Sequence, residues 1–262
     1  MTINYVPLDK AIHKDLKLAA KPDYSYTQNT HIAAASIREY PQLATAMPIV
    51  FIKDESTGNH HSVAMLGVEQ QKNLYLHEGK WQAPQVPMNI QRYPFDIRPD
   101  GDKLGLYIDE NSSLLSTEEG NPLFNEDGNP GDVLQNRLNF MDLLANSERL
   151  TAEFIQKMVE LELLTAIEIR YVTVNNERRT ITGMLGIDEP KLLDLPDADV
   201  LALHKKGFLG AVYAVMMSLG QLNRLVELSN NTDSPIRSLQ IVNLAQEAAA
   251  KAKAEAEAEV KQ

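Results

Sequence analysis

The hydrophobic pattern of this chain changes near residues 81–110, and this change limits the folds that the chain can adopt. Before this stretch, short apolar runs separated by turn residues are typical of strands; after it, apolar residues recur mainly at helical spacing. Within it, Tyr93-Pro94-Phe95 holds two rings in defined directions, because proline fixes its own backbone angle and restricts the preceding residue. The pattern predicts an α+β protein, with a β-rich N-terminal half and a helical C-terminal half.

The β-rich half comprises residues 1–122 and is predicted to form a curled antiparallel sheet with hairpins. The apolar run at residues 47–52 suits a buried strand, and the glycine-containing turn at residues 55–59 predicts a hairpin with the next run. Residues 31–40 fit either a strand or a short helix, and residues 81–110 are expected to cross the sheet. Further strands are predicted at residues 62–68, 73–76 and 104–108.

The helical half comprises residues 123–230, and we expect it to pack with the first half as one unit. Asp132 is predicted to cap a helix, with Gln135 completing a capping box, and Thr151 is predicted to cap a second helix. This half also carries a second hairpin and a short helix. The hairpin strands are predicted at residues 166–174 and 180–187, and the short helix at residues 197–207.

The C-terminal part of the chain contains two segments of opposite character. Residues 207–228 are apolar on nearly all sides over their first three turns, which predicts a central, buried helix. Residues 231–262 form a tail rich in alanine, lysine and glutamate. Since the low-complexity part of this tail has no apolar face to bury, we expect a solvated extension.

Composition and charge remove several classes of function. The chain has 25 basic and 36 acidic residues and a net charge of -11, which repels nucleic acid and anionic membranes. Cysteine is absent, so disulfides, thiolate nucleophiles and cysteine-ligated zinc are excluded. The N-terminus lacks the apolar core of a signal peptide, and the longest apolar run, residues 207–217, is shorter than the roughly 20 residues of a membrane span. We expect a soluble, cytoplasmic protein with no membrane span.

No metal or cofactor site is predicted from the sequence. The adjacent His60 and His61 would point to opposite faces of a strand, so exposed side chains are a better interpretation than a metal site. The other histidines show no ligand spacing with one another. Residues 125–132 place oxygen-bearing side chains around a glycine, but a β-turn followed by a helix cap explains them better than a calcium loop does.

Signatures of catalysis are also missing. Glycine-rich phosphate loops and the common nucleophile motifs do not occur. The acidic pairs Asp109-Glu110 and Glu118-Glu119 would suit acid–base chemistry, but in a chain with 36 acidic residues a solvated face is the favoured interpretation. We therefore assign no catalytic residue. The absence of these motifs also favours a protein without enzymatic activity.

A group of aromatic residues with a neighbouring arginine remains as the candidate site. The favoured interpretation is a corner of the core, in which tryptophan and tyrosine keep their polar atoms near water. The alternative is a recognition surface, because tryptophan, tyrosine and arginine dominate binding hot spots. The residues concerned are Trp81, Arg92, Tyr93, Phe95 and Tyr107.

Short segments spread over about residues 5–228 carry a family resemblance. They are residues 47–51 (MPIVF), 65–68 (MLGV), 73–75 (NLY), 79–81 (GKW), 92–95 (RYPF), 123–124 (LF) with 127–128 (DG), 183–186 (GMLG) and 209–225, the last including SLGQ. In this order they resemble the SapC family, which is named for a protein linked to bacterial surface-layer genes. The alanine-rich tail lies outside the resemblance.

The resemblance implies a setting rather than a mechanism. It supplies no catalytic residues for positions in this chain. Members of the family look to be encoded near TonB-dependent receptors and flavin-dependent halogenases in Gram-negative bacteria. This implies an accessory to outer-membrane uptake or to the modification of an aromatic substrate.

Three functional hypotheses follow. The first is a soluble, non-enzymatic accessory that binds a peptide, a protein partner or a small aromatic ligand through the aromatic group. The second is an enzyme without a recognisable motif, acting on a peptide or aromatic metabolite beside a flavin-dependent halogenase or oxygenase; it predicts a deep pocket holding a residue with a strongly perturbed pKa. The third is a structural subunit, in which residues 207–228 pair with their copy in a homodimer.

Overall fold

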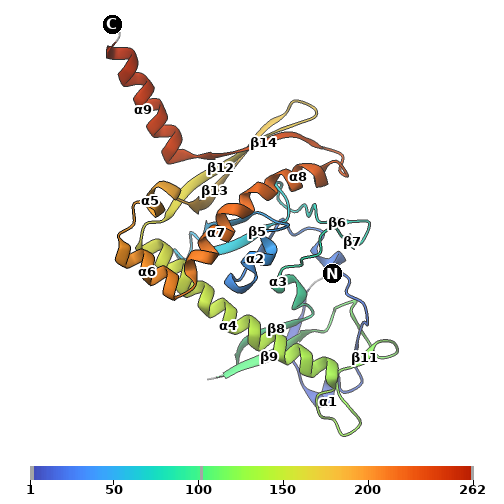
Figure 1. Ribbon diagram of the computed structural model, residues 1–262. Helices are drawn as coiled ribbons and strands as arrows, with labels where there is room; N and C mark the ends of the chain where they lie inside the picture. The colour runs from blue at the N-terminus through green and yellow to red at the C-terminus, as the bar shows by residue number, and fades with distance from the viewer. Residues whose placement is uncertain (1–2, 101–102, 261–262) are drawn as a thin grey trace.

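A six-stranded antiparallel sheet lies at the centre of the fold (Figure 1). The computed structural model describes residues 3–100 and 103–260. The strands of this main sheet are β3 (Ile32–Ala34), β4 (Ile49–Lys53), β5 (His60–Met65), β12 (Leu164–Thr173), β13 (Arg178–Ile187) and β14 (Ile236–Asn243). Their order is β14-β12-β13-β4-β5-β3, so strands from both halves of the chain form one sheet.

Smaller sheets surround the main one. In a three-stranded sheet, β9 lies between β1 and β8; in another, β2 lies between β10 and β11; and β6 pairs with β7. These strands are β1 (Tyr5–Pro7), β2 (Lys17–Leu18), β6 (Leu76–His77), β7 (Lys80–Trp81), β8 (Phe95–Asp100), β9 (Lys103–Asp109), β10 (Leu115–Ser116) and β11 (Asn121–Pro122).

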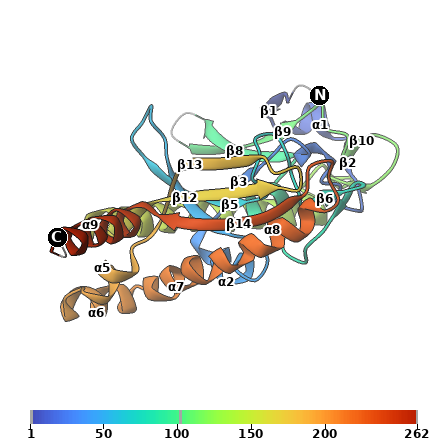
Figure 2. The same ribbon diagram turned by 90° about the horizontal axis from the view of Figure 1, so that it is seen from above.

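The helices lie beside the main and smaller sheets, except for α9 (Figure 1). They are α1 (Lys10–His13), α2 (Tyr40–Leu43), α3 (Met88–Gln91), α4 (Asp132–Glu160), α5 (Glu189–Leu193), α6 (Asp197–Lys205), α7 (Phe208–Ser218), α8 (Leu222–Ser229) and α9 (Leu244–Val260), with short 3-10 turns η1 (Ser25–Thr27), η2 (Ile37–Glu39) and η3 (Leu219–Gln221). Figures 1 and 2 show α6, α7 and α8 following one another along one side of the sheet, and α9 pointing away from the body.

Helix α4 connects two hydrophobic cores. With 29 residues it is about 43 Å long. Its first half contributes Leu134 and Met141 to a small core beside the β1-β9-β8 sheet, which also contains Phe95. Its second half contributes Phe154 and Met158 to the large core around the main sheet. One rigid helix therefore fixes the small sheet relative to the large one.

The predicted fold class is confirmed. The N-terminal half is rich in antiparallel strands, and the C-terminal region is mainly helical. The first predicted hairpin is β4–β5, and the second is β12–β13. Residues 31–40, which fitted two alternatives, contain both: β3, and then η2 leading into α2. The division at residues 122 and 123 stays a prediction.

Two predicted helix caps are wrong. The cap of α4 is Gly131, and Asp132 is the first helical residue. Thr151 caps no second helix, because α4 continues through it. Its side chain is buried, donates a hydrogen bond to the carbonyl of Ser147 at 2.7 Å and accepts one from the backbone N–H of Ile37 at 2.8 Å. A threonine can stay inside a helix when its hydroxyl bonds to the preceding turn.

Other predicted segments differ from the structure. Residues 81–110 do not cross the main sheet; they contain α3 and the β8–β9 hairpin, which pairs with β1. Of residues 73–76, only Leu76 belongs to a strand. Strand β14, within the predicted tail, was not foreseen; it pairs with β12 along its length and buries Ile236. Its alternation is too weak to show in the sequence, and pairing with β12 provides its stability.

The apolar segment 207–228 is only partly buried. It is divided by η3 into α7 and α8, and Val212 and Val215 of α7 are fully buried. On the other side of α7, Tyr213 and Met217 are 49% and 76% exposed. Over the part of the chain that the structure describes, no single helix has the length and apolar character of a membrane span. The two segments Asp197–Lys205 and Phe208–Ser229 together would be long and apolar enough, but they meet at an angle of 92°.

Candidate ligand-binding site

The structure divides the five predicted site residues between two cores. Trp81 packs against the large core, with its ring centroid 5.6 Å from that of Tyr24 and 5.8 Å from that of Tyr75. Its indole N–H donates to the carbonyl of Gln85 at 2.7 Å. Phe95 is completely buried in the small core. Trp81 and Phe95 therefore have packing roles that the core interpretation predicted.

Arg92 and Tyr107 lie in a charged cluster around the β8–β9 hairpin. The carboxylate of Asp96 forms ion pairs with Arg92 at 3.1 Å and with Arg98 at 3.0 Å. The guanidinium of Arg98 lies over the ring of Tyr5 at 4.4 Å and over that of Tyr107 at 5.6 Å. Because Arg92 already has a carboxylate partner, its positive charge is largely neutralised within the fold.

Tyr93 lies where the N-terminal segment meets the end of α3. Its ring stacks on that of Tyr26, with centroids 4.1 Å apart, and its hydroxyl donates to a carboxylate oxygen of Asp109 at 2.8 Å. The peptide bond between Tyr93 and Pro94 is cis. Asp109 also accepts hydrogen bonds from the backbone N–H groups of Asn4 and Asn111. The expected solvated face is wrong for Asp109, which is buried because three donors satisfy it.

A hollow of about 240 Å³ lies beside Tyr93 and is the candidate site. Its walls include three tyrosine side chains and one arginine, namely Tyr24, Tyr26, Tyr93 and Arg137, and we call it the tyrosine cavity. The N-terminal segment before and within η1 supplies two tyrosines, and α4 supplies the arginine. Asp23 initiates η1 by accepting a hydrogen bond from the backbone N–H of Ser25 at 2.8 Å.

Arg137 provides the cavity with a half-buried positive charge. Its Nη1 donates to the carbonyl of Gln91 at 2.9 Å, and it forms no ion pair with any residue that the structure describes. Burial lowers the pKa of Arg137, while the nearby Tyr24 and Tyr26 raise it. Because the ordinary pKa of an arginine lies far above neutrality, the guanidinium stays charged. The cavity therefore contains a cation that lacks a carboxylate partner in the described chain.

The tyrosines of the cavity stay neutral at ordinary pH. The hydroxyl of Tyr26 donates to the carbonyl of Ile90, although 41% of the residue is exposed. Burial raises the pKa of Tyr26 strongly, and it also raises the pKa values of Tyr24 and Tyr93. The arrangement offers neutral aromatic faces and one fixed cation. Such walls suit the binding of an aromatic molecule more than the transfer of protons.

A larger and more open groove lies between α4 and the main sheet. It consists of two adjoining hollows of about 640 and 600 Å³, which share His60 and Val159. Burial, helped by Lys53 and His61, lowers the pKa of His60, so this imidazole is neutral at physiological pH. Across residues 3–100 and 103–260, no group of three side chains could hold a metal ion. Two of the charges in the groove pair with each other, Lys191 and Glu162, at 3.2 Å.

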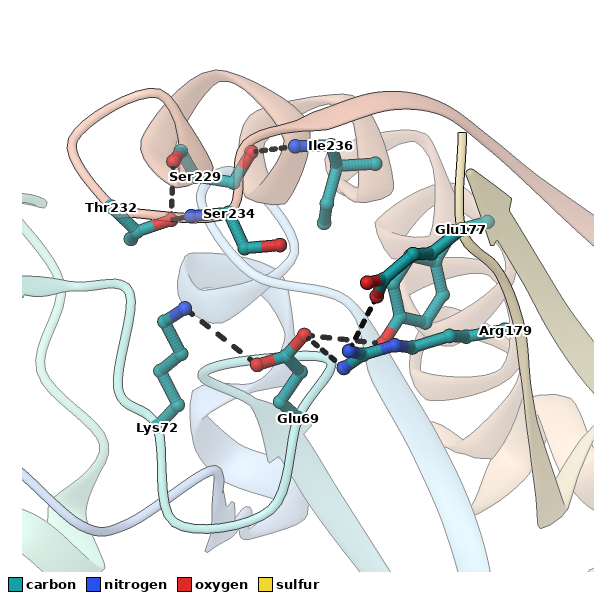
Figure 3. Close-up of polar contacts among 9 residues, drawn as sticks. Glu69, Lys72, Glu177, Arg179, Ser229, Thr232, Ser234 and Ile236 are labelled. Atoms are coloured by element: carbon teal, nitrogen blue, oxygen red, sulfur yellow. Dashed lines mark hydrogen bonds and ion pairs between the residues drawn. The ribbon is translucent and has the colours of Figure 1, made fainter. Parts of the chain in front are cut away.

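A third polar cluster lies where β13 meets the turn after β5. Figure 3 shows Glu69 between Lys72 and Arg179, with ion-pair distances of 3.6 and 2.7 Å. Glu177 pairs with the same arginine at 2.7 Å. The adjacent hollow measures about 10 Å³, which is enough for about one water molecule. These ion pairs connect the turn after β5 to β13, and Arg179 also lines a separate hollow of about 350 Å³ between β12, β13 and β14.

Of the five residues predicted from the sequence, Tyr93 lines the tyrosine cavity and Trp81 packs against its Tyr24; the other lining residues Tyr24, Tyr26 and Arg137 were not predicted. The contact between Tyr26 and Tyr93 joins distant segments, and no local pattern reveals it. The spacing of residues could have identified Arg137. It lies three residues after Leu134 and four before Met141, which are both buried, and so falls on the same face of the helix. A charged residue on a buried helical stripe indicates a special environment. Arg92, Phe95 and Tyr107 are not among the residues that line the cavity.

Comparison with known proteins places this chain in a family. The family model described as SapC matches residues 8–225, which include β9, the β12–β13 hairpin, α7 and the residues that line the tyrosine cavity. Neither the curated proteins nor the solved structures contain a match. The matched region covers most of the 262 residues and nearly coincides with the span, about residues 5–228, over which the similar segments lie. The chain belongs to the SapC family.

Proposed function

We propose that this protein is a non-enzymatic binding protein whose ligand occupies the tyrosine cavity. The ligand is a small aromatic molecule or the aromatic side chain of a peptide. The observation that carries this proposal is the cavity itself, in which three tyrosines and a half-buried arginine surround about 240 Å³. Sites for small ligands are concave, aromatic and supplied with few polar groups, and this cavity has that character.

The exposed part of Tyr26 makes the cavity accessible. Its hydroxyl is held by the carbonyl of Ile90, and its ring is supported by the stack on Tyr93. Part of the residue remains open, at 41% exposure. An aromatic ligand would bind to a ring that is already fixed in place, which lowers the entropy lost on binding.

The perturbed pKa values in the cavity favour binding over catalysis. The enzyme hypothesis predicts a pocket residue with a strongly perturbed pKa, which Tyr26 has, but acid–base catalysis also needs that pKa near the working pH. Burial moves the pKa of Tyr26 upwards and away from neutrality, so its phenol is a poor general base. The carboxylate of Asp23 accepts hydrogen bonds from the N–H and hydroxyl of Ser25, which define the start of η1. The lining residues therefore support a binding role.

The proposal includes a cellular setting that rests on the family. As a SapC-family member, the protein would act in the cytoplasm as an accessory to surface-layer or TonB-dependent uptake systems. The ligand would be the molecule taken up or a peptide of a partner protein. Family membership supports this setting, and the aromatic walls of the cavity agree with an aromatic ligand.

The single tryptophan gives a direct test of the proposed function. Trp81 lies 5.6 Å from Tyr24, centroid to centroid, so a ligand in the cavity should change its emission. A panel of small aromatic acids, amides and amines would be titrated into the wild type and into Tyr26→Ala. We expect saturable emission changes, weakened about tenfold or more in the variant, because a stacking surface is lost.

A matched variant controls this test. Tyr213→Ala makes the same change at an exposed tyrosine of α7, outside the residues that line the cavity, and should leave binding unchanged. Circular dichroism would establish that both variants are folded. Equal affinities for the wild type and folded Tyr26→Ala would show that the ligand binds elsewhere, and no binding of any panel member would refute the proposed function.

A further inference from the structure

We propose that the tyrosine cavity binds aromatic carboxylic acids, with Arg137 receiving the carboxylate. This inference rests on the proposed function and names the chemical class of the ligand. It is carried by three observations: the hydrogen-bond donors of Arg137 that no described residue uses, the excess of positive charge in the lining, and the aromatic faces beside that charge.

Arg137 has the geometry that carboxylate recognition needs. A guanidinium carries five N–H donors in a planar fork. Within the described chain, Arg137 uses Nη1 for the carbonyl of Gln91 and forms no ion pair. This bond fixes the direction of the side chain, while other donors remain for a ligand. Arginine forks match the two oxygens of a carboxylate, and charge-assisted bonds of this kind are the stronger class of hydrogen bond.

The charge of the lining also favours an anion. Lys21 contributes a second cation, and Asp23 is the carboxylate among the lining residues that the structure describes. One oxygen of Asp23 is engaged by the backbone N–H and hydroxyl of Ser25. The lining thus carries a net positive charge, although the whole chain has a net charge of -11. This local charge favours a negatively charged ligand over a positively charged one.

The position of the tyrosine rings favours an aromatic group as the part of the ligand next to the carboxylate. Tyr24 and Tyr26 are close enough to Arg137 to affect its titration, so aromatic faces and the cation border the same space. A hollow of about 240 Å³ is small, and it suits one ring with a short acidic arm better than a large polycyclic ligand. Phenylacetate has this form and is the natural probe.

The test compares three probes that share a ring and differ in charge: phenylacetate, phenylacetamide and 2-phenylethylamine. Isothermal titration calorimetry at low salt would measure each with the wild type, Arg137→Gln and Arg137→Lys. We expect the wild type to bind the acid about tenfold more tightly than the amide, since a charge-assisted bond contributes more than a neutral one. Arg137→Gln should remove this preference without changing affinity for the amide, and Arg137→Lys should retain part of it.

Arg149→Gln is the matched control. Arg149 is an exposed arginine on the same helix, outside the lining of the cavity, so its substitution changes the net charge equally. It should leave the preference for the acid intact. A further comparison tests whether the carboxylate can belong to a peptide chain. It uses a tripeptide that ends in phenylalanine and the same tripeptide with a C-terminal amide. If the free acid bound as tightly as phenylacetate, the terminus of a peptide would be a source of the ligand.

The outcomes separate this inference from the proposed function. Equal binding of acid and amide by the wild type, or an unchanged preference in folded Arg137→Gln, would overturn carboxylate recognition while leaving a binding protein in place. Absence of binding by all three probes at millimolar concentration would overturn this inference, and the proposed function would fall with it only if no member of the wider panel bound. A loss of acid preference in Arg149→Gln as large as that in Arg137→Gln would attribute the effect to net charge, and would also overturn the inference.

Discussion

Single buried hydroxyl groups connect segments of this protein that are far apart in sequence. Ser218 of α7 accepts a hydrogen bond from the backbone N–H of Ile49 at 2.8 Å and donates to the carbonyl of Val215 at 2.6 Å. Thr151 of α4 accepts from the N–H of Ile37 in the same way. Each hydroxyl satisfies a buried backbone donor that has no partner in a strand or helix, which native folds almost always require.

Replacement of Ser218 by alanine should therefore destabilise the fold. The buried N–H of Ile49 would lose its acceptor, and we expect the free energy of unfolding to fall by about 1–3 kcal/mol. Urea denaturation of Ser218→Ala measures this loss. The control Ser113→Ala makes the same change at an exposed position and should have little effect. If the two variants were equally stable, Ser218 would not have the structural role described.

Glu39 should make stability depend on pH. Its carboxylate is buried, with hydrogen bonds from the backbone N–H groups of Ser36 at 2.8 Å and Met88 at 2.7 Å. Burial raises the pKa of Glu39 above its ordinary value of 4.5, against the opposite effect of these bonds. Because the folded state holds the proton more tightly, this contribution to stability is present below pH 4.5 and is lost as pH rises through the folded pKa.

The comparison of Glu39→Gln with the wild type isolates this contribution. Glutamine cannot ionise, so the difference in unfolding free energy between the two proteins should move in favour of the variant as pH rises from about 4.5 towards neutrality. Urea denaturation at several pH values gives this difference. Glu55→Gln, at an exposed glutamate, is the control and should follow the wild type. Parallel pH profiles for Glu39→Gln and the wild type would contradict the assignment.

At the scale of elements, the two C-terminal elements differ in what they contribute. Strand β14 pairs with β12 from Ile236 to Asn243 and buries Ile236. Helix α9 contacts β12 through the ion pair of Arg170 with Glu247 at 2.9 Å, and both side chains are partly exposed. Exposed ion pairs contribute about 1 kcal/mol or less. The strand therefore belongs to the folded body, and the helix is an appendage.

Two truncations test this difference. A chain that ends after Asn243 should lose no more than about 1 kcal/mol of unfolding free energy. A chain that ends after Pro235 exposes the edge of β12 and removes buried Ile236, so it should lose about 3 kcal/mol or more. Thermal and urea denaturation of both chains would show the order. Equal stability of the two truncated chains would mean that β14 adds nothing to the sheet.

The local sequence was sufficient to predict some helices and strands but not others. The hairpins β4–β5 and β12–β13 were predictable, because alternation and turn residues are local properties. Strand β14 was not, since the edge of β12 stabilises it. The uninterrupted α4 was also missed, because the acceptor role of Thr151 depends on Ile37 in a distant segment. Where local propensity is weak, contacts with distant segments thus decide which secondary structure forms.

For the whole molecule, the same limit applies to the candidate site. Tyr93 and Trp81 were found because they lie in one conspicuous segment. The cavity also needs Tyr26 from the N-terminal segment and Arg137 from α4, and only the folded chain brings these together. The aromatic residues conspicuous in the sequence therefore lie near the candidate site, while Arg137, its cation, comes from a distant segment.

The homodimer suggested for residues 207–228 stays a prediction. Tyr213 and Met217 lie exposed on α7 and would be available to a second copy. Light scattering at high protein concentration decides this point, since a monomer would remove the idea. A dimer that reverts to a monomer in Met217→Glu would establish the interface.

The most direct test of the binding site is hydrogen–deuterium exchange with and without saturating phenylacetate, followed by mass spectrometry. The ligand should order the walls of the tyrosine cavity, so we predict slower exchange in residues 18–26 and 91–93. The groove provides an internal comparison, and exchange in residues 58–62 and 148–159 should not change. Protection confined to the groove, or no protection in residues 18–26, would contradict the assignment of the tyrosine cavity as the binding site.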